Sequence, residues 1–251
     1  LLEDGWSVRA FTRNRNNEKL TSIENEHLEI FEGDLSNEDS LAQAMQGQYG
    51  LYSVQPIIPD NVEEELRQGE MIIDTAERQG VNYVVYSTAG GVNRDRTGPH
   101  FEALAQLENK IKASRLNFTI IKPSFFMDNF LRITKVENGE IKIPEFIDPN
   151  VKFAMISSID IAKIASTLFE DAESYNHQEL EIASDELTLN EVVKTFATVT
   201  GKPTEIEGAF TSGTAERSWL EEKGYVIDFL QIERINPTRL TLDKWIAEVG
   251  F

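Results

Sequence analysis

The chain has 251 residues, 40% of them hydrophobic and 27% charged, and its 24 Lys and Arg against 43 Asp and Glu give a formal net charge of −19. This composition is typical of a globular protein with a sizeable core, and the negative charge argues against direct binding of nucleic acid, whose phosphates it repels. The sequence has no cysteine, no apolar run of about 18 residues and no recognisable signal peptide, so it predicts a cytoplasmic protein without disulfides or a membrane span.

Strands and helices are expected to alternate over the first half of the chain. The candidate strands are short β-branched or aromatic runs, whereas the candidate helices are longer and place apolar residues at helical spacing. This alternation predicts a parallel sheet covered by helices on both faces, which is a doubly wound α/β fold. The expected strands are 7–12, 28–32, 50–54, 82–87 and 117–122, and the expected helices are 38–45, 63–79 and 101–113.

The pattern changes after about residue 125, where shorter and more mixed elements begin. The expected elements are helices at 125–136 and 158–170, a strand at 180–183, a helix at 188–200 that opens with the capping box of Thr188 and Glu191, a strand within 201–207, and helices near Trp219 and Trp245. We infer a nucleotide-binding domain over 1–136, with 156–170 returning to it, and a smaller α+β lobe over 137–251 that binds substrate or partner.

Several stretches together resemble one known family. They are VRAFTRN, EGDLSNEDSLAQAMQG, YVVYSTAGG, the run from HFEALAQLE to NFTIIKPSFFMDNFL, and ISSIDIAKIA. They are similar to the NmrA-like group of atypical short-chain dehydrogenases, the HSCARG-like NAD(P)-binding proteins. The resemblance implies a Rossmann-type sheet and an NAD(P) cofactor.

The resemblance also bears on how the sequence opens. Leu1–Asp4 and Gly5 read as the last turn of a helix and its cap. In the family this helix follows a strand and a glycine-rich turn, so we expect a truncation that removes roughly 20 residues upstream. That strand runs between the strands at 7–12 and 50–54. Without it, we expect two strand edges that either stay unpaired or close up, and poor dinucleotide binding.

Thr12 and Arg13 end the first expected strand, where such folds select their cofactor. An acidic residue there bonds the ribose 2′-hydroxyl of NAD, whereas an arginine accommodates the 2′-phosphate of NADP. Arg13 therefore favours NADP(H) over NAD(H), and an exposed arginine at a strand end is the alternative interpretation. The resemblance implies that Asp34 binds the adenine amino group and that Leu35 packs on the ring. The residues equally fit a turn in which Asp34, together with Ser36, caps the next helix.

Val54, Gln55, Pro56 and Ser87 follow two later strands. Because open α/β sheets bind ligands at the carboxyl ends of their strands, we expect these residues to contact the cofactor. Ser87 also matches by position the serine of the short-chain dehydrogenase triad. Its alternative role is a strand-end hydroxyl that bonds the backbone.

The stretch HFEALAQLE departs from the usual catalytic pattern. Typical short-chain dehydrogenases use Tyr-x-x-x-Lys, in which the lysine lowers the pKa of the phenol and holds the nicotinamide ribose. NmrA-like relatives often carry His in the Tyr place and keep the Lys. Here the two positions hold His100 and Leu104. Leucine cannot donate to ribose, so we expect incomplete proton-transfer machinery, and His100 is either a titrating group or a structural residue.

Pro123 and Ser124 follow the strand at 117–122, and the resemblance implies that they line the nicotinamide side. The remaining histidines, His27 and His177, have no second ligand at metal spacing, so no metal site is expected.

Two functions stay open at this point, and with them whether the protein is an enzyme. The first is an NADP(H)-binding redox sensor or regulator that acts through a protein partner. The second is an NAD(P)H-dependent oxidoreductase that reduces quinones or similar small carbonyl compounds. Such a reductase mainly needs to orient a bound hydride donor against its acceptor.

Overall fold

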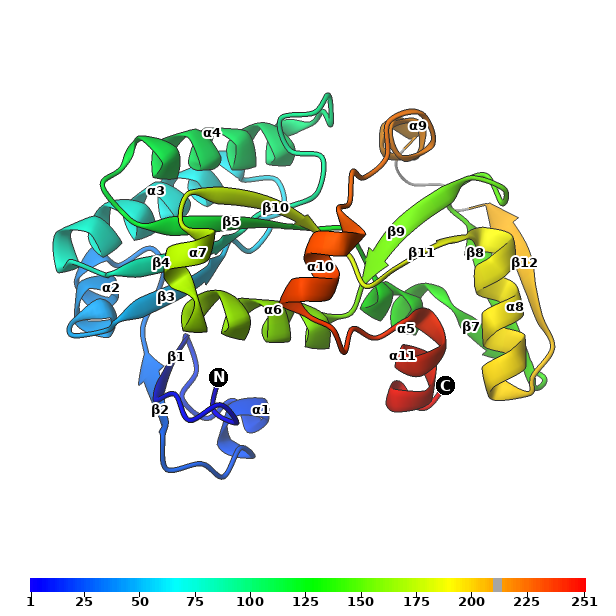
Figure 1. The fold of residues 1–251 in the computed structure, drawn as a ribbon, viewed down its shortest axis with the longest axis horizontal. Coiled ribbons are helices and arrows are strands. Elements are labelled where there is room, and N and C mark those ends of the chain that lie inside the picture. The colour runs from blue at the N-terminus through cyan, green and yellow to red at the C-terminus, as the bar shows by residue number, and fades with distance from the viewer. Residues whose placement is uncertain (210–213) are drawn as a thin grey trace. The chain divides into compact units, whose positions relative to one another are not determined.

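The structure is a computed structural model that describes residues 1–209 and 214–251 (Figure 1). Its backbone contacts divide the chain into two compact units. Unit 1 comprises Leu1–Thr88, Glu102–Ile120 and Ala165–Gln178, and unit 2 comprises Ala89–Phe101, Ile121–Ile164 and Glu179–Phe251. The domain limits expected from the sequence stay a prediction.

The predicted alternation of strands and helices in the first half of the chain is confirmed. The short helix α1 was not predicted, whereas the other bounds agree within two residues. The elements are β1 (Val8–Thr12), α1 (Glu18–Thr21), β2 (Leu28–Glu32), α2 (Glu38–Met45), β3 (Gly50–Val54), α3 (Val62–Gln79), β4 (Tyr83–Ser87), α4 (Pro99–Ala113) and β5 (Phe118–Pro123).

Asparagine caps the first three helices. The side chain of Asn17 accepts a hydrogen bond from the N–H of Lys19, and Asn37 and Asn61 cap α2 and α3 in the same way. Each of these bonds satisfies an N–H group that the first helical turn leaves without a partner. At the other end of α3, Gly80 takes φ 69°, which only glycine adopts without strain.

The strands of the first half lie in two separate sheets. β1 and β2 pair in parallel as a two-stranded sheet, and β3 and β4 pair in parallel within a sheet of order β10-β5-β4-β3, where β10 is Gln178–Ile182. Within residues 1–209 and 214–251, no ladder joins β1 to β3. The facing edges of β1 and β3 were expected either to stay unpaired or to close up, and in the structure they are unpaired.

The core of unit 1 lies between its sheet and the helices α3 and α4, which run side by side in Figure 1. Ile72 and Ile73 of α3 and Leu107 and Ile111 of α4 pack with alternate residues of β4, which is buried along its whole length. A continuous apolar strand of this kind is expected in a sheet covered on both faces.

Unit 2 contains most elements of the second half. The helix expected at 125–136 is wrong, because Phe125 and Phe126 pair in parallel with Met155 and Ile156 of β9 as a strand. The chain there forms β6 (Phe125–Phe126), η1 (Met127–Asn129), α5 (Phe130–Ile133) and β7 (Lys135–Glu137). Then follow β8 (Glu140–Glu145), β9 (Lys152–Ile156), α6 (Ser158–Glu170), α7 (Ala172–Tyr175), β11 (Asp185–Thr188), α8 (Leu189–Thr200), β12 (Thr204–Ala209), α9 (Thr214–Glu222), α10 (Phe229–Ile235) and α11 (Leu242–Val249).

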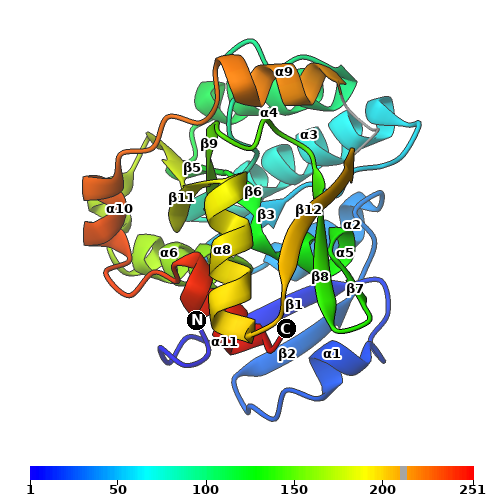
Figure 2. The ribbon, with the colours of Figure 1, turned by 90° about the vertical axis from the view of Figure 1, so that its right-hand side faces the viewer.

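Unit 2 has its own sheets and its own core. Its strands form sheets of order β11-β9-β6 and β12-β8-β7, and Figure 2 shows α8 along β12 and β8. The predicted capping box is present, since Thr188 accepts from the N–H of Glu191 and the Glu191 carboxylate accepts from the N–H of Thr188. The core is rich in aromatic rings, with Phe130, Phe196 and Trp245 fully buried.

Candidate functional site

Thr12 and Arg13 lie at the carboxyl end of β1, as predicted. The carbonyl of Thr12 accepts a hydrogen bond from the N–H of Gly33 at 2.9 Å, which joins the ends of β1 and β2. The Arg13 side chain is exposed and makes no hydrogen bond or ion pair with any residue that the structure describes. By contrast, the guanidinium of Arg15 donates to the carbonyl of Ile30 at 3.4 Å. Arg13 is therefore a cation at this strand end that is available to an anionic ligand.

Asp34 and Leu35 follow β2. The expectation that Asp34 and Ser36 cap the next helix is wrong, because Asn37 is the N-cap of α2 and Asp34 instead accepts from the N–H of Ser36 at 2.8 Å. This turn fixes the exposed carboxylate of Asp34 beside the end of β1. Leu35 packs against the core of unit 1.

The turn after β2 is held to α3 by the carboxylate of Glu64. It accepts from the Ser36 hydroxyl at 2.8 Å and from Gln68, and both its oxygens bond the guanidinium of Arg67 at 2.7 Å. Because Arg67, Gln68 and Ser36 all bond the charged form, they lower the pKa of Glu64 to about 2.

Val54, Gln55, Pro56 and Ser87 meet at the carboxyl ends of β3 and β4. Val54 is paired with Ser87 in the strand register. Val54 and Pro56 are exposed, whereas Gln55 and Ser87 are buried. The Gln55 Nε2 group donates to the Ser53 hydroxyl at 3.4 Å, and its Oε1 atom is buried without a partner in the described part of the chain. Buried acceptors without donors are rare in proteins, so this atom is a candidate ligand contact.

Two buried carboxylates lie near this strand end, and the sequence pattern did not indicate them. Glu65 of α3 and Glu108 of α4 are 1% and 0% exposed. Glu108 accepts from the Thr88 hydroxyl at 2.8 Å. Burial raises the pKa of the Tyr86 hydroxyl, and the charges of Glu108 and Glu65 raise it further. In the sequence these glutamates look like any solvated helix position.

Pro123 and Ser124 belong to unit 2. The carbonyl of Pro123 accepts from the N–H of Gly90 at 2.8 Å, and the N–H of Ser124 donates to the carbonyl of Ile182 at 3.1 Å. The Ser124 hydroxyl is buried and has no partner among the residues described. It is thus a second candidate contact, of the same kind as Gln55.

His100 and Leu104 lie one turn apart near the start of α4. The His100 ring packs edge-on against Phe101 at 5.3 Å between centroids. Leu104 is only 3% exposed, so an apolar side chain fills the place that a lysine takes in the usual pattern. No ammonium group is available at this position.

The loop 89–98 after β4 is clamped to the region of α9 within unit 2. Arg96 donates to the carbonyl of Gly90 at 2.6 Å and pairs with Glu216. Its guanidinium carbon lies 4.1 Å from the ring centroid of Phe101 and 4.8 Å from that of Trp219. The indole of Trp219 in turn donates to the carbonyl of Arg94 at 2.9 Å.

The Arg94 guanidinium pairs with Glu181 at 2.7 Å, and Glu181 also accepts from the N–H of Gly91 at 2.9 Å. The sequence did not predict this clamp, because bonded partners such as Trp219 and Arg94 are 125 residues apart.

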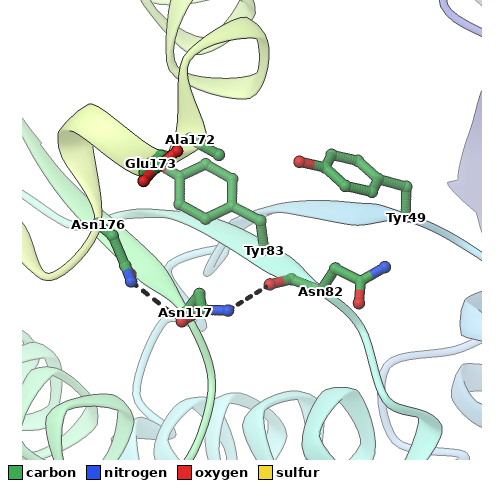
Figure 3. Close-up of a pocket in the computed structure, with 7 residues that line it drawn as sticks. All are labelled: Tyr49, Asn82, Tyr83, Asn117, Ala172, Glu173 and Asn176. Atoms are coloured by element: carbon green, nitrogen blue, oxygen red, sulfur yellow. Dashed lines mark hydrogen bonds between the residues drawn. The ribbon is translucent and has the colours of Figure 1, made fainter.

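One pocket of about 280 Å³ lies in unit 1, away from these strand ends. Figure 3 shows it at the amino ends of β3, β4 and β5. None of the predicted site residues lines it. Its lining residues are Tyr49, Asn82, Tyr83, Asn117, Ala172, Glu173 and Asn176.

No group of three His, Cys, Asp or Glu side chains is arranged to hold a metal ion in the part of the chain that was described. In the same residues, no helix is long and apolar enough to cross a membrane.

Comparisons with known proteins place these features in context. A family model described as NmrA-like family matches residues 1–217. The NAD(P)H azoreductase of Xenophilus azovorans is 27% identical over 173 residues, which cover 68% of this chain. The chain spans 58% of the length of that relative.

Two solved structures show the same fold. The triphenylmethane reductase of a Citrobacter species, complexed with NADP(H), superposes with a TM-score of 0.77 at 17% identity, over 96% of this chain and 90% of that one. NmrA, a negative transcriptional regulator solved with NADP, superposes with a TM-score of 0.78 at 14% identity. The match covers 97% of this chain and 87% of the NmrA chain. A further NmrA structure holds NAD. The predicted doubly wound Rossmann-type α/β fold is thereby confirmed.

Proposed function

Because the chain belongs to the NmrA-like family, we propose that the natural protein that contains residues 1–251 binds NAD(P)(H), with preference for NADP(H), and that it acts as a redox sensor or regulator with incomplete dehydrogenase machinery. One observation carries the cofactor assignment. Arg13 stands exposed and unpaired, within the described residues, at the strand end that faces the 2′ position of the adenosine ribose in this type of fold.

The residues of unit 1 fit such a cofactor in two further places. The fixed carboxylate of Asp34 can accept from the adenine amino group. The orphaned Gln55 Oε1 atom is a buried polar group that a ligand would satisfy. When bound, NADPH supplies a hydride.

The regulatory role rests on Leu104. A buried leucine cannot hold the nicotinamide ribose or lower the pKa of a neighbouring acid, so this chain lacks the lysine that proton transfer uses in typical relatives. A sensor instead needs two conformations that bind oxidised and reduced cofactor, or a protein partner, with different affinities.

The alternative is an NAD(P)H-dependent reductase of quinones or similar small carbonyl compounds. The similarity to an azoreductase favours it, since such a reaction transfers a hydride to an electron-poor acceptor. Water can supply the proton, so orientation of the two reactants is the main requirement.

Calorimetric titration of NADPH and NADH into the natural protein that contains residues 1–251 tests the cofactor assignment. We expect Arg13→Ala to weaken the binding of NADPH by about 10- to 100-fold, because a charge-assisted hydrogen bond contributes about 1.5–3 kcal/mol. The affinity for NADH, which has no 2′-phosphate, should change little. Arg15→Ala is the matched control, since that guanidinium already bonds the backbone. Equal losses of NADPH and NADH affinity in Arg13→Ala would contradict the assignment.

Turnover separates the two functions. NADPH absorbance is followed with a panel of quinones and aldehydes. Sustained oxidation of NADPH with any of them would exclude the sensor and support the reductase.

A further inference from the structure

We propose that the pocket at the amino ends of β3, β4 and β5, called here the amino-edge pocket, binds a small organic ammonium ion. Its seven lining residues all belong to unit 1. The predicted dinucleotide contacts in that unit lie at the carboxyl ends of the strands. The two ligands therefore use opposite edges of the sheet, and the proposal does not depend on the proposed function.

The walls of the amino-edge pocket are fixed by backbone pairing. The N–H of Asn82 donates to the carbonyl of Tyr49 at 2.9 Å, and the N–H of Val84 donates to the carbonyl of Asn117 at 2.9 Å. These bonds hold the starts of β3, β4 and β5 side by side. The remaining wall is α7 and the residue that follows it, Asn176.

A chain of amides stiffens one side of the pocket (Figure 3). Asn176 accepts from the N–H of Phe118 at 3.1 Å and donates to the Asn117 side chain at 3.0 Å. Asn117 donates in turn to the carbonyl of Asn82 at 3.1 Å. The amides are thus already oriented, so a ligand does not have to order them on binding.

Two tyrosine rings form the apolar part of the pocket. Tyr83 is buried, and its hydroxyl bonds Thr119 Oγ1 at 2.5 Å. Burial raises the pKa of Tyr83, which keeps it a neutral phenol. Tyr49 is 44% exposed and stacks on Trp6 with ring centroids 5.7 Å apart. Figure 3 shows the Tyr49 hydroxyl directed toward Tyr83. Tyrosine rings attract cations through the negative potential of their faces.

The charge of the pocket selects the sign of the ligand. The Glu173 carboxylate is exposed and has no hydrogen bond or ion pair in the described part of the chain. None of the seven lining residues is basic. Asp171, the residue before α7, lies close enough to act on the Tyr83 hydroxyl. An anion would be repelled here, whereas an ammonium group would gain a carboxylate and an aromatic face together.

The volume of the pocket selects the size of the ligand. At about 280 Å³ it is at or below the lower end of the range of about 300–1,000 Å³ that drug-sized ligands occupy. A single amine with a short apolar body fits this space.

Three probes of the same shape test the proposal. The natural protein is titrated with tert-butylammonium, tert-butanol and pivalate, and the side-chain amide signals of Asn82, Asn117 and Asn176 are followed by NMR. We expect saturable shifts with the ammonium ion alone. We expect Glu173→Gln to weaken its binding about tenfold, which corresponds to about 1.4 kcal/mol. Glu70→Gln removes an equal charge from the exposed surface of α3 and should leave binding within about twofold.

Each of three results would overturn the proposal. Shifts that rise linearly with concentration, or that are equal for tert-butanol and tert-butylammonium, would mean that no cation site exists. Equal weakening in Glu173→Gln and Glu70→Gln would mean that only the overall negative charge attracts the ion. Both substitutions are at exposed positions and should leave the fold unchanged, which circular dichroism checks. NADPH affinity is measured separately, because the proposal does not depend on the proposed function.

Discussion

Glu64 is a half-buried residue of α3 whose carboxylate is held by three side chains. The Ser36 hydroxyl, the Gln68 amide and the Arg67 guanidinium all bond its carboxylate, which lowers its pKa from 4.5 to about 2. A group whose pKa is lowered by folding stabilises the folded state fully above its unfolded pKa. That contribution is lost as the pH falls through its folded pKa.

We therefore expect wild type to lose more unfolding free energy than Glu64→Gln between about pH 4.5 and pH 2, because the glutamine has no proton to gain. Urea unfolding over a series of pH values measures this difference. Glu63→Gln is the matched control, since Glu63 is exposed and has no partner among the described residues. Parallel pH profiles for wild type and Glu64→Gln would contradict the expectation.

The place of a candidate residue in the fold was predictable where that residue ends or follows a strand, whereas its role in binding stays a prediction. Arg13, Gln55 and Ser124 were placed at strand ends from the sequence alone, and each proves to have an unused polar group within the described chain. Glu65 and Glu108 were not predictable, because a buried glutamate differs from a solvated one only in what surrounds it. Their burial follows from the packing of α3 and α4.

At the scale of elements, the clamp on the loop 89–98 depends on glycine. Gly91 has φ 81°, and a Cβ atom built there would lie 2.1 Å from the buried ring of Trp219. The ring is held in turn by its bond to Arg94 and by the guanidinium of Arg96. It has little freedom to move aside.

We expect Gly91→Ala to lower the free energy of unfolding by about 2–4 kcal/mol, because backbone strain and overpacking add. Gly47→Ala isolates the strain alone, since Gly47 has φ 72° and nothing within 4 Å of its Cβ position. That control should cost about 1 kcal/mol. Chemical unfolding monitored by tryptophan fluorescence compares the two. A Gly91→Ala loss no larger than that of Gly47→Ala would refute the tight approach of Trp219.

Elements were predictable where local signals agree. The capping box of Thr188 and Glu191 located α8, and the period of apolar residues located α3. The prediction for the segment after Pro123 was wrong. Two phenylalanines and a following apolar run fit a helix, whereas pairing with β9 makes Phe125 and Phe126 a strand. Such pairing depends on residues about 30 positions away and cannot be read from the segment itself.

At the scale of the whole molecule, 43 acidic residues against 24 basic ones repel one another in the folded state. Raising the salt concentration from 0.01 to 0.15 M shortens the Debye length from about 30 Å to about 8 Å. We expect the melting temperature at pH 7 to rise by about 2–4 °C, equivalent to about 1 kcal/mol.

Calorimetry in NaCl at the two concentrations measures this rise. The same comparison near pH 4.6, the isoelectric point of the sequence, is the control, because the net charge there is close to zero. A rise of equal size at both pH values would show that the salt acts by some means other than screening.

The fold class could be predicted because strands and helices alternate over more than a hundred residues, which leaves few topologies. The limits of the segment that returns to unit 1 could not be read from the sequence, because residues 165–178 join that unit only through tertiary contacts.

The unpaired edges of β1 and β3 have a practical consequence. Each of these strands has one hydrogen-bonded neighbour in the described chain, so each presents a row of N–H and C=O groups to which another strand can pair. A peptide that pairs with these edges would slow amide hydrogen exchange in β1 and β3.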